Sequence, residues 1–334
     1  MARRACHAHR MNIQNTLEIS ARQSAVAQNP NDPELHVALG NAYFEADEQA
    51  HARFAYERAI ALDPGSWAAH NAVGHVYYKL NMPTQSVMAY ERAIVLDPLN
   101  DHPYFGLAIL LSTKLADYDG AIAALERGLT ANPGSELLRD TVGATHARYG
   151  RISAALAVLE PALKKNPKDD YARGWLGLLY LHQKRLADSV AVLSEESRYA
   201  ASRDGQRMLG YAYAQMGDPA TAAGHLRAAV EAAPDDYEAR GALVTVCHAL
   251  GLSNEAAEHE HIAQAQAARD DAYGQACYAA VRGDVEHALT LLAKTFATDG
   301  RAQRGWANID PELTFIAVDK RFQALVQDQG TAAR

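Results

Sequence analysis

A spacing of about 34 residues recurs along most of this 334-residue chain, and it restricts the possible folds more than any other feature. Proline marks the spacing, with one gap of nearly two periods in which Ala201 takes the vacant place. The prolines are Pro30, Pro64, Pro98, Pro133, Pro167 and Pro234. A period of this length is the signature of stacked structural repeats, each of which buries its apolar face against the next.

Glycine keeps the same period inside each unit, and a second small residue follows twelve positions later. The glycines are Gly40, Gly74, Gly143, Gly177 and Gly210, and the small residues are Ala52, Ser86, Ala155, Ser189 and Ala222. Apolar residues between these marks recur every three or four positions, which predicts two amphipathic helices per unit. A helical glycine costs about 1 kcal/mol relative to alanine. We therefore expect the glycine and the small residue to face each other where the two helices cross closely.

The unit boundaries carry helix-ending and helix-starting residues. Each proline ends the second helix, because it cannot donate a backbone hydrogen bond and clashes with the preceding turn. Asp32 with Pro33, and Ser135, are predicted to cap the helices that follow them.

These positions resemble the tetratricopeptide repeat, whose signature combines a Leu-Gly pair, two aromatic residues, two small residues and a terminal proline. The first unit fills those positions with Leu39, Gly40, Tyr43, Ala52, Tyr56, Ala59 and Pro64, and the second with Val73, Gly74, Tyr77, Ser86, Tyr90, Ala93 and Pro98. The resemblance implies an all-α protein, an α-solenoid of antiparallel helix pairs in a right-handed superhelix with about seven or eight repeats.

The resemblance also predicts how the chain is divided. An extension with a leading helix covers residues 1–32, and seven units cover residues 33–268. The units are 33–66, 67–100, 101–135, 136–169, 170–202, 203–236 and 237–268, followed by a degenerate unit at 269–300 and a capping segment at 301–334.

Two units depart from the pattern. The unit at 170–202 lacks its proline and has Glu196 in place of a small residue, and the unit at 237–268 has Val244 for glycine and Cys247 and Glu260 for the aromatic residues. We expect irregular stacking at both places.

The last part of the chain resembles the closing segment of bacterial-type proteins of this family. Asp310 and Pro311 are predicted to start a short helix. Trp306, Leu313, Phe315, Phe322 and Leu325 are expected to cover the apolar end of the last repeat. An end surface for self-association is the alternative interpretation of this segment.

Charge, apolar runs and cysteines narrow the function classes. Thirty-two basic and forty acidic side chains give a net charge of −8, which disfavours a general phosphate-binding surface and predicts no nucleic-acid partner. No apolar run is long enough for a membrane span, and the basic start lacks the apolar stretch of a secretory leader. The three cysteines have no metal-site or disulfide spacing, so a reducing compartment, by default the cytoplasm, is expected.

In the resembled family the first helix of each pair lines a concave wall that binds peptides. The same positions here carry aromatic and polar residues suited to an extended or helical peptide. The candidate groove residues are Asn41, Phe44, Asn71, His75, Tyr78, Lys79, His102, Phe105, Tyr171, His182, Arg207 and Tyr211. A sub-class that clamps acidic chaperone tails uses Lys, Asn and Arg at five positions. Only Asn41 matches that set, so this clamp is excluded.

Catalytic and metal motifs are not evident. His259 and His261 are two residues apart on a predicted helix and point to different sides. His36 and His70 share one repeat position, which indicates a packing role, and the pairs Glu195–Glu196 and Asp169–Asp170 are typical of solvated turns. No cofactor is predicted.

We therefore expect a non-catalytic scaffold or adaptor that binds a protein or peptide. A structural protein that assembles through its terminal repeats is the alternative, and a metal or enzyme site in the groove is a third possibility.

Overall fold

The computed structural model of the chain describes residues 2–195, 197–298, 304, 307 and 309–327. These residues form helices, turns and loops, and none of them lies in a strand. Trp306 and Glu196, for which a cap and an irregular repeat were expected, lie outside the described residues. The chain separates into two compact units, residues 1–141 (the N-terminal unit) and residues 142–334 (the C-terminal unit).

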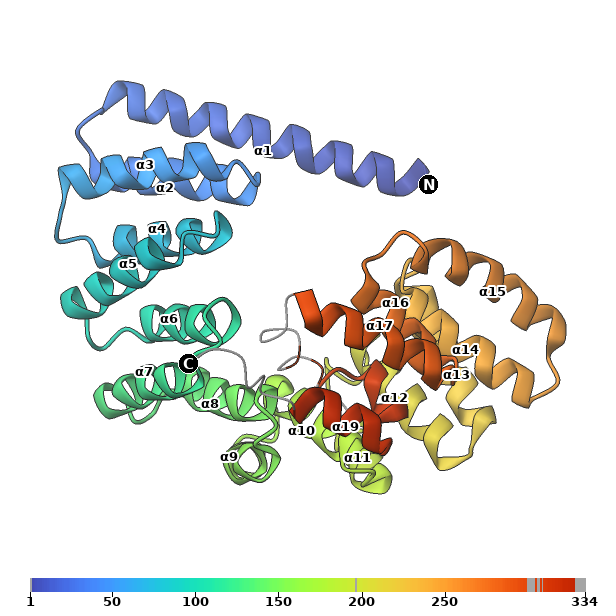
Figure 1. Cartoon of the computed structure of the whole chain (residues 1–334). Helices are drawn as coiled ribbons and strands as arrows, with labels where there is room; N and C mark the ends of the chain where they lie inside the picture. The colour runs from blue at the N-terminus through green and yellow to red at the C-terminus, as the bar shows by residue number, and fades with distance from the viewer. Residues whose placement is uncertain (1, 196, 299–303, 305–306, 308, 328–334) are drawn as a thin grey trace. The chain divides into compact units, whose positions relative to one another are not determined.

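The N-terminal unit begins with a long helix that is followed by paired helices of nearly equal length. Their bounds are α1 Ala2–Gln28, α2 Pro33–Glu45, α3 Gln49–Leu62, α4 Trp67–Lys79, α5 Pro83–Leu96, α6 Asp101–Thr113 and α7 Tyr118–Ala131. Consecutive helices pack antiparallel in the pairs α2–α3, α4–α5 and α6–α7, and the first helices also contact one another in the order α2, α4, α6 (Figure 1). Helix α8, Glu136–Arg148, spans the division between the two units.

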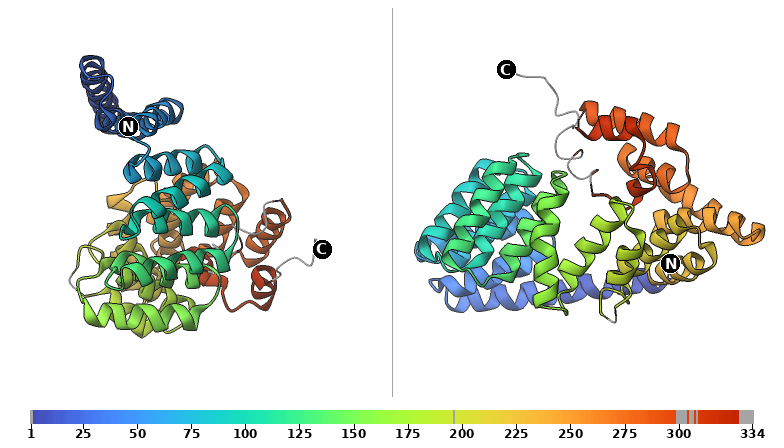
Figure 2. Two further views of the ribbon diagram at one scale, coloured as in Figure 1. Left: turned by 90° about the vertical axis from the view of Figure 1, so that its left-hand side faces the viewer. Right: turned by 90° about the horizontal axis from the view of Figure 1, so that it is seen from below.

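The C-terminal unit continues the helix pairs. Their bounds are α9 Ile152–Lys165, α10 Asp170–His182, α11 Leu186–Leu193, α12 Arg203–Met216, α13 Pro219–Ala232, α14 Tyr237–Ala249, α15 Ser253–Ala267, α16 Ala272–Val281 and α17 Val285–Thr298. A short 3₁₀ helix, η1 Glu312–Ile316, and the helix α19 Lys320–Gln327 end the described chain. The first helices again contact one another in the order α10, α12, α14, α16 (Figure 2).

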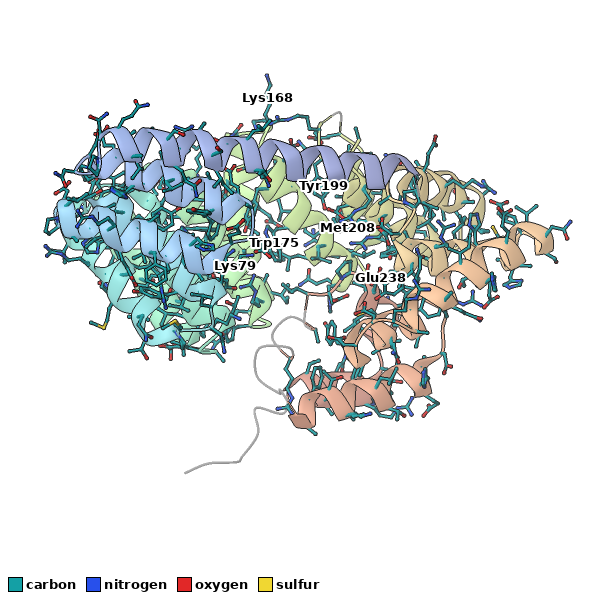
Figure 3. The ribbon with its side chains drawn as sticks, turned by 90° about the horizontal axis from the view of Figure 1, so that it is seen from above. Lys79, Lys168, Trp175, Tyr199, Met208 and Glu238 are labelled. Carbon is teal, nitrogen blue, oxygen red and sulfur yellow. The ribbon has the colours of Figure 1, made fainter. Side chains whose placement is uncertain are left out.

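This arrangement confirms the all-α solenoid of helix pairs that the repeat spacing predicts. The expected irregularity in the unit at 170–202 appears as a shortened second helix, because α11 has 8 residues where α9 and α13 have 14. Tyr199, in the loop after α11, fills the space beside Gly174, and its hydroxyl lies 3.9 Å from the sulfur of Met208 (Figure 3).

The repeat glycine faces a larger neighbour than the sequence suggests. A Cβ on Gly40 would lie 2.5 Å from the ring of Tyr56, sixteen residues later, and a Cβ on Gly74 would lie 2.7 Å from the ring of Tyr90. The glycine and the small residue do meet, as expected, and the space of the missing side chain is filled by the residue at the sixteenth position. The small residue sits beside the glycine carbonyl, to which the Ser86 hydroxyl donates at 2.8 Å near Gly74.

The predicted caps are present. The Asp32 carboxylate accepts hydrogen bonds from the backbone amides of Glu34 and Leu35, with Pro33 in the first helical position. The Ser135 hydroxyl accepts from the amide of Leu138. Each cap satisfies backbone donors that have no partner inside the helix.

A further contact recurs at most repeat boundaries; at Pro133 the equivalent side chain, Arg139, bonds the carbonyl oxygens of Gly134 and Ser135 instead. The side chain six residues after the repeat proline turns back to bond the carbonyl oxygen of that proline; in the unit without the proline, Gln206 bonds the carbonyl oxygen of Ala200. The pairs are His36 with Pro30, His70 with Pro64, Tyr104 with Pro98, Arg173 with Pro167, Gln206 with Ala200 and Arg240 with Pro234. The packing role predicted for His36 and His70 is this contact.

The end of the chain covers the last helix pair and also reaches further back. Leu313 and Phe322 are buried in one apolar cluster with α16 and α17, and Leu325 packs against it, as the sequence predicts. Ile309 and Phe315 instead pack against clusters formed by earlier repeats. The expectation that Phe315 helps to cover the end of the last repeat is therefore wrong.

Candidate peptide-binding faces

The first helices of the N-terminal unit form a pocket of about 330 Å³. Five of the candidate groove residues line it, together with other side chains of α2 and α4 and with Tyr56 of α3. Its lining is Val37, Asn41, Phe44, Tyr56, Trp67, Ala68, Asn71, Ala72, His75 and His102. The structure thus brings together residues from α2, α4 and α6, three successive repeats.

Tyrosines from the second helices hold the polar residues of this pocket in place. The Tyr56 hydroxyl donates to Asn41 Oδ1 at 2.6 Å, and the Tyr90 hydroxyl hydrogen bonds with His75 Nδ1 at 2.9 Å. Asn41 and His75 occupy the same repeat position, directly after the repeat glycine. The close helix crossing at that glycine is therefore also what lets the tyrosine hydroxyl reach the inner face.

Burial favours the uncharged forms of His75, Tyr56 and Tyr90 in and beside this pocket. Burial, and then the charge of His102, lowers the pKa of His75, so its imidazole is neutral at pH 7. Burial raises the pKa of both Tyr56 and Tyr90, so both hydroxyls keep their protons. The Asn71 amide nitrogen lies 3.5 Å from His75 Nε2. The amide oxygen, Asn71 Oδ1, is buried and has no hydrogen-bond partner among the described residues. The pocket offers neutral donors and acceptors beside the rings of Phe44 and Trp67.

The remaining candidates of the N-terminal unit lie outside this pocket. The Tyr78 hydroxyl bonds Thr113 Oγ1 at 3.2 Å, and Lys114 lies over the Tyr78 ring. Lys79 is exposed at the end of α4, and Phe105 is half-buried on α6 (Figure 3).

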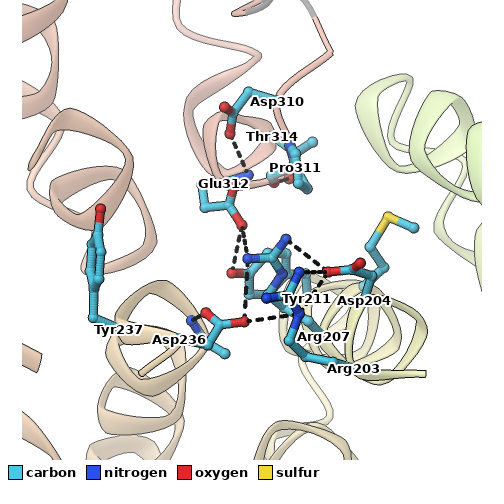
Figure 4. Close-up of polar contacts among 12 residues, drawn as sticks. Arg203, Asp204, Arg207, Tyr211, Asp236, Tyr237, Asp310, Pro311, Glu312 and Thr314 are labelled. Carbon is cyan, nitrogen blue, oxygen red and sulfur yellow. Dashed lines mark hydrogen bonds and ion pairs between the residues drawn. The ribbon is translucent and has the colours of Figure 1, made fainter. Parts of the chain in front are cut away.

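In the C-terminal unit the candidate residues have different surroundings. Tyr171 is half-exposed and packs edge-on against Trp175. Burial, and then the charge of Lys184, lowers the pKa of His182 to about 4. On α12, Tyr211 is buried and Arg207 is partly buried, and the chain's own residues 310–315 lie on them (Figure 4). These two residues are therefore not on an open groove wall, which corrects the expectation from sequence.

The contacts of this C-terminal stretch are polar and closely spaced. The Tyr211 hydroxyl donates to Glu312 Oε1 at 3.0 Å, and Arg207 Nη1 lies 3.2 Å from the same oxygen. Arg207 also pairs with Asp236 at 3.4 Å. Burial alone would lower the pKa of Arg207, but the charges of Glu312 and Asp236 raise it well above its usual value. The guanidinium stays charged and pairs with the carboxylates of both Glu312 and Asp236.

One group in the described residues has metal-ligand types within reach of each other: Cys277, Asp310 and Glu312, all buried, with ligand atoms within 4.8 Å. Burial and the charge of Asp310 raise the pKa of Cys277, and burial and the charge of Glu312 raise the pKa of Asp310. Metal binding needs deprotonated ligands. Glu312 is also neutralised by Arg207, so the three residues fit a hydrogen-bonded cluster better than a metal site. His259, the densest histidine spot in the sequence, contacts Arg240 at 2.8 Å.

Comparison with known families decides the identity of the repeats. Models of the tetratricopeptide repeat match residues 33–66, 145–202 and 203–246. The chain is a tetratricopeptide repeat protein. Proteins of this family are generally scaffolds for protein–protein interaction that lack catalysis of their own. No match is found among curated proteins.

Solved structures share the fold at low sequence identity. A tetratricopeptide repeat protein from Parabacteroides merdae is 15% identical with a TM-score of 0.53, and the match covers 64% of this chain and 85% of that one. PilF of Pseudomonas aeruginosa is 17% identical with a TM-score of 0.50, covering 64% and 94%. A chain of the Cut9–Hcn1 complex of the APC/C is 16% identical with a TM-score of 0.56. That match covers 78% of this chain and 51% of the other. None of the helices described here has the length and apolar character that crossing a membrane requires.

Proposed function

We propose that this tetratricopeptide repeat protein is a non-catalytic scaffold that binds a peptide segment of a partner protein in the pocket of its N-terminal unit. The observation that carries the proposal is the convergence of Asn41, Phe44, Asn71, His75 and His102 on one pocket. These residues come from three successive repeats, so the pocket is made by stacking and by no single unit.

The chemistry of the pocket favours an uncharged peptide segment with an apolar or aromatic side chain. Phe44 and Trp67 supply apolar area, and Asn71 and the neutral His75 supply donors and acceptors that can pair with a peptide backbone. His75 offers no cation to an acidic side chain at pH 7, because its burial lowers its pKa.

The test is selection of binders from a random peptide library displayed on phage, followed by affinity measurement with the best synthetic peptide. Replacement of both polar residues, Asn71→Ala with His75→Ala, is expected to weaken binding at least tenfold, which corresponds to about 1.4 kcal/mol. Gln85→Ala serves as the matched control, since Gln85 is exposed on the second helix α5 and lies outside the pocket.

Two results would contradict the proposal. Selected peptides that bind the double variant and the natural protein equally would place binding elsewhere. If the library yields no peptide that binds this pocket, the proposal that the pocket is a peptide-binding site is wrong.

A further inference from the structure

Residues 309–315 lie along the inner face of the C-terminal unit, the face formed by first helices α10, α12 and α14. Lys184 Nζ, just after α10, donates to the carbonyl oxygen of Thr314 at 2.7 Å, and Gln215 Nε2 on α12 donates to Thr314 Oγ1 at 3.0 Å. These hydrogen bonds involve both a backbone carbonyl and a side chain of residues 309–315, as in the recognition of a bound peptide.

The central contact is a desolvated ion pair. The Glu312 side chain is 7% exposed and lies 3.2 Å from Arg207, whose own side chain is 16% exposed. Among the residues of the stretch, Glu312 supplies the carboxylate that pairs with this desolvated guanidinium, and loss of a partner from such a pair is costly. Asp236 and Asp204 also neighbour Arg207, at 3.4 Å each, and they hold its guanidinium in position.

An aromatic contact between Phe315 and Tyr211 adds to these polar contacts. The ring of Phe315 packs edge-on against that of Tyr211, with centroids 5.2 Å apart and planes at 80°. Tyr211 is fully buried and donates to Glu312 as well, so one side chain of the inner face engages two residues of the stretch. Edge-on ring pairs contribute about 0.5–1.5 kcal/mol beyond the area that they bury.

The two sides of η1 pack against different parts of the C-terminal unit. A 3₁₀ helix has three residues per turn, so Glu312 and Phe315 share one side of η1, and Leu313 and Ile316 share another. Leu313 and Ile316 are buried in the cluster with α16 and α17, where they close the end of the repeats. Closing that end does not require the acidic and aromatic side that faces Arg207 and Tyr211.

We propose that residues 310–315 are an internal ligand that occupies a second peptide-binding face, on α10–α14, and that this face binds a partner peptide of the same chemistry. The peptide carries a carboxylate for Arg207, a hydroxyl two residues later for Gln215, and an aromatic ring one residue after that for Tyr211. This face differs from the pocket of the N-terminal unit, because it selects an anionic peptide and is filled by the chain itself.

The experiment uses the full chain and a fluorescent peptide with the sequence of residues 309–318. The variant Glu312→Ala/Thr314→Ala/Phe315→Ala loses the polar and aromatic contacts but keeps Leu313, Ile316 and Phe322 to close the end. Fluorescence anisotropy is expected to show peptide binding to this variant at least tenfold tighter than to the natural protein. Val318→Ala is the control, because Val318 is 65% exposed, and it should behave like the natural protein.

Specificity is tested in the same assay. Adding Arg207→Ala to the triple variant, or replacing the glutamate of the peptide by alanine, is expected to weaken binding at least tenfold. Equal binding to the natural protein and the triple variant, or none to a triple variant with a native circular dichroism spectrum, would overturn the proposal. A dimer of the natural protein that disappears with Phe315→Ala would assign the face to a second copy's tail, and would overturn the internal ligand too.

A second readout does not depend on the triple variant folding. Cys277 lies beneath Asp310 and is buried, so its reaction with a thiol reagent reports release of the stretch. In a Cys6→Ser/Cys247→Ser background, the single variant Glu312→Gln is expected to raise the labelling rate of Cys277 at least tenfold. An unchanged rate would show that residues 310–315 are held without the Arg207 contact, and would count against the proposal.

Discussion

Two glycines of one helix pair show how the same residue type meets opposite surroundings. Gly210 on α12 belongs to the repeat pattern, and a Cβ there would lie 2.6 Å from Leu226 on α13. Gly224 on α13 is exposed, and a Cβ there would meet no atom within 4 Å. The repeat period distinguishes the two in the sequence, and the packing gives the reason.

The substitution Gly210→Ala is expected to destabilise the protein by about 1–2 kcal/mol, because overpacking against Leu226 outweighs the helix propensity gained. Gly224→Ala, in the same pair, should stabilise it by up to about 1 kcal/mol. Urea unfolding followed by circular dichroism measures both. A Gly210→Ala variant as stable as the natural protein would show that α12 and α13 can accommodate the added methyl group without loss of stability.

At the scale of the element, the contact between a side chain and the preceding repeat boundary joins one helix pair to the next. Arg173 on α10 is the most buried example, at 1% exposure. It donates to the carbonyl oxygens of Pro167 at 2.5 Å and Val192 at 2.7 Å, and it pairs with the exposed carboxylate of Glu195. The arginine thus satisfies backbone acceptors on both sides of the pair.

Arg173→Leu is expected to lower the free energy of unfolding by about 2–4 kcal/mol, since two buried carbonyl groups lose their donors. Arg269→Leu, at an exposed position, should change it by less than about 0.5 kcal/mol. Chemical denaturation of both variants compares them directly, and similar losses would mean that the carbonyl contacts contribute little.

For the whole molecule, one carboxyl group makes stability depend on pH near neutrality. Glu238 lies in the first turn of α14, close to the face that holds residues 310–315 (Figure 3). Burial, and then the charges of Glu312 and Asp236, raise the pKa of Glu238 to about 7 from 4.5, while Arg207 opposes the rise. The folded chain therefore binds this proton more tightly than the unfolded chain does. Its contribution to stability is full below pH 4.5 and is lost as the pH rises through about 7.

We expect the free energy of unfolding to fall by about 1 kcal/mol between pH 6 and pH 8 on account of this group. Glu238→Gln should remove that part of the fall. Thermal unfolding of both proteins at matched ionic strength provides the measurement. The idea fails if the variant keeps the full pH dependence of the natural protein.

The repeat architecture could be predicted because it is local and periodic. Gly40, Pro64 and their equivalents act within one helix pair, and stacking of similar pairs follows once each has an apolar face to bury. The caps at Asp32 and Ser135 were predictable for the same reason, since a cap involves residues two or three apart. The convergence of Asn41, Asn71 and His75 on one pocket follows from their shared or neighbouring repeat positions, though what they bind remains a proposal.

The tertiary structure alone decided which residues contact one another across long separations. Nothing in the period indicates that Glu312 lies on Arg207 and Tyr211, because that contact joins residues about a hundred positions apart and occurs once. The same holds for the raised pKa of Glu238, which depends on charges brought together by folding. The sequence by itself therefore determined the repeated helix pair. Only folding decided that the end of the chain lies along the inner face of α10–α14, since a contact that occurs once leaves no periodic signal.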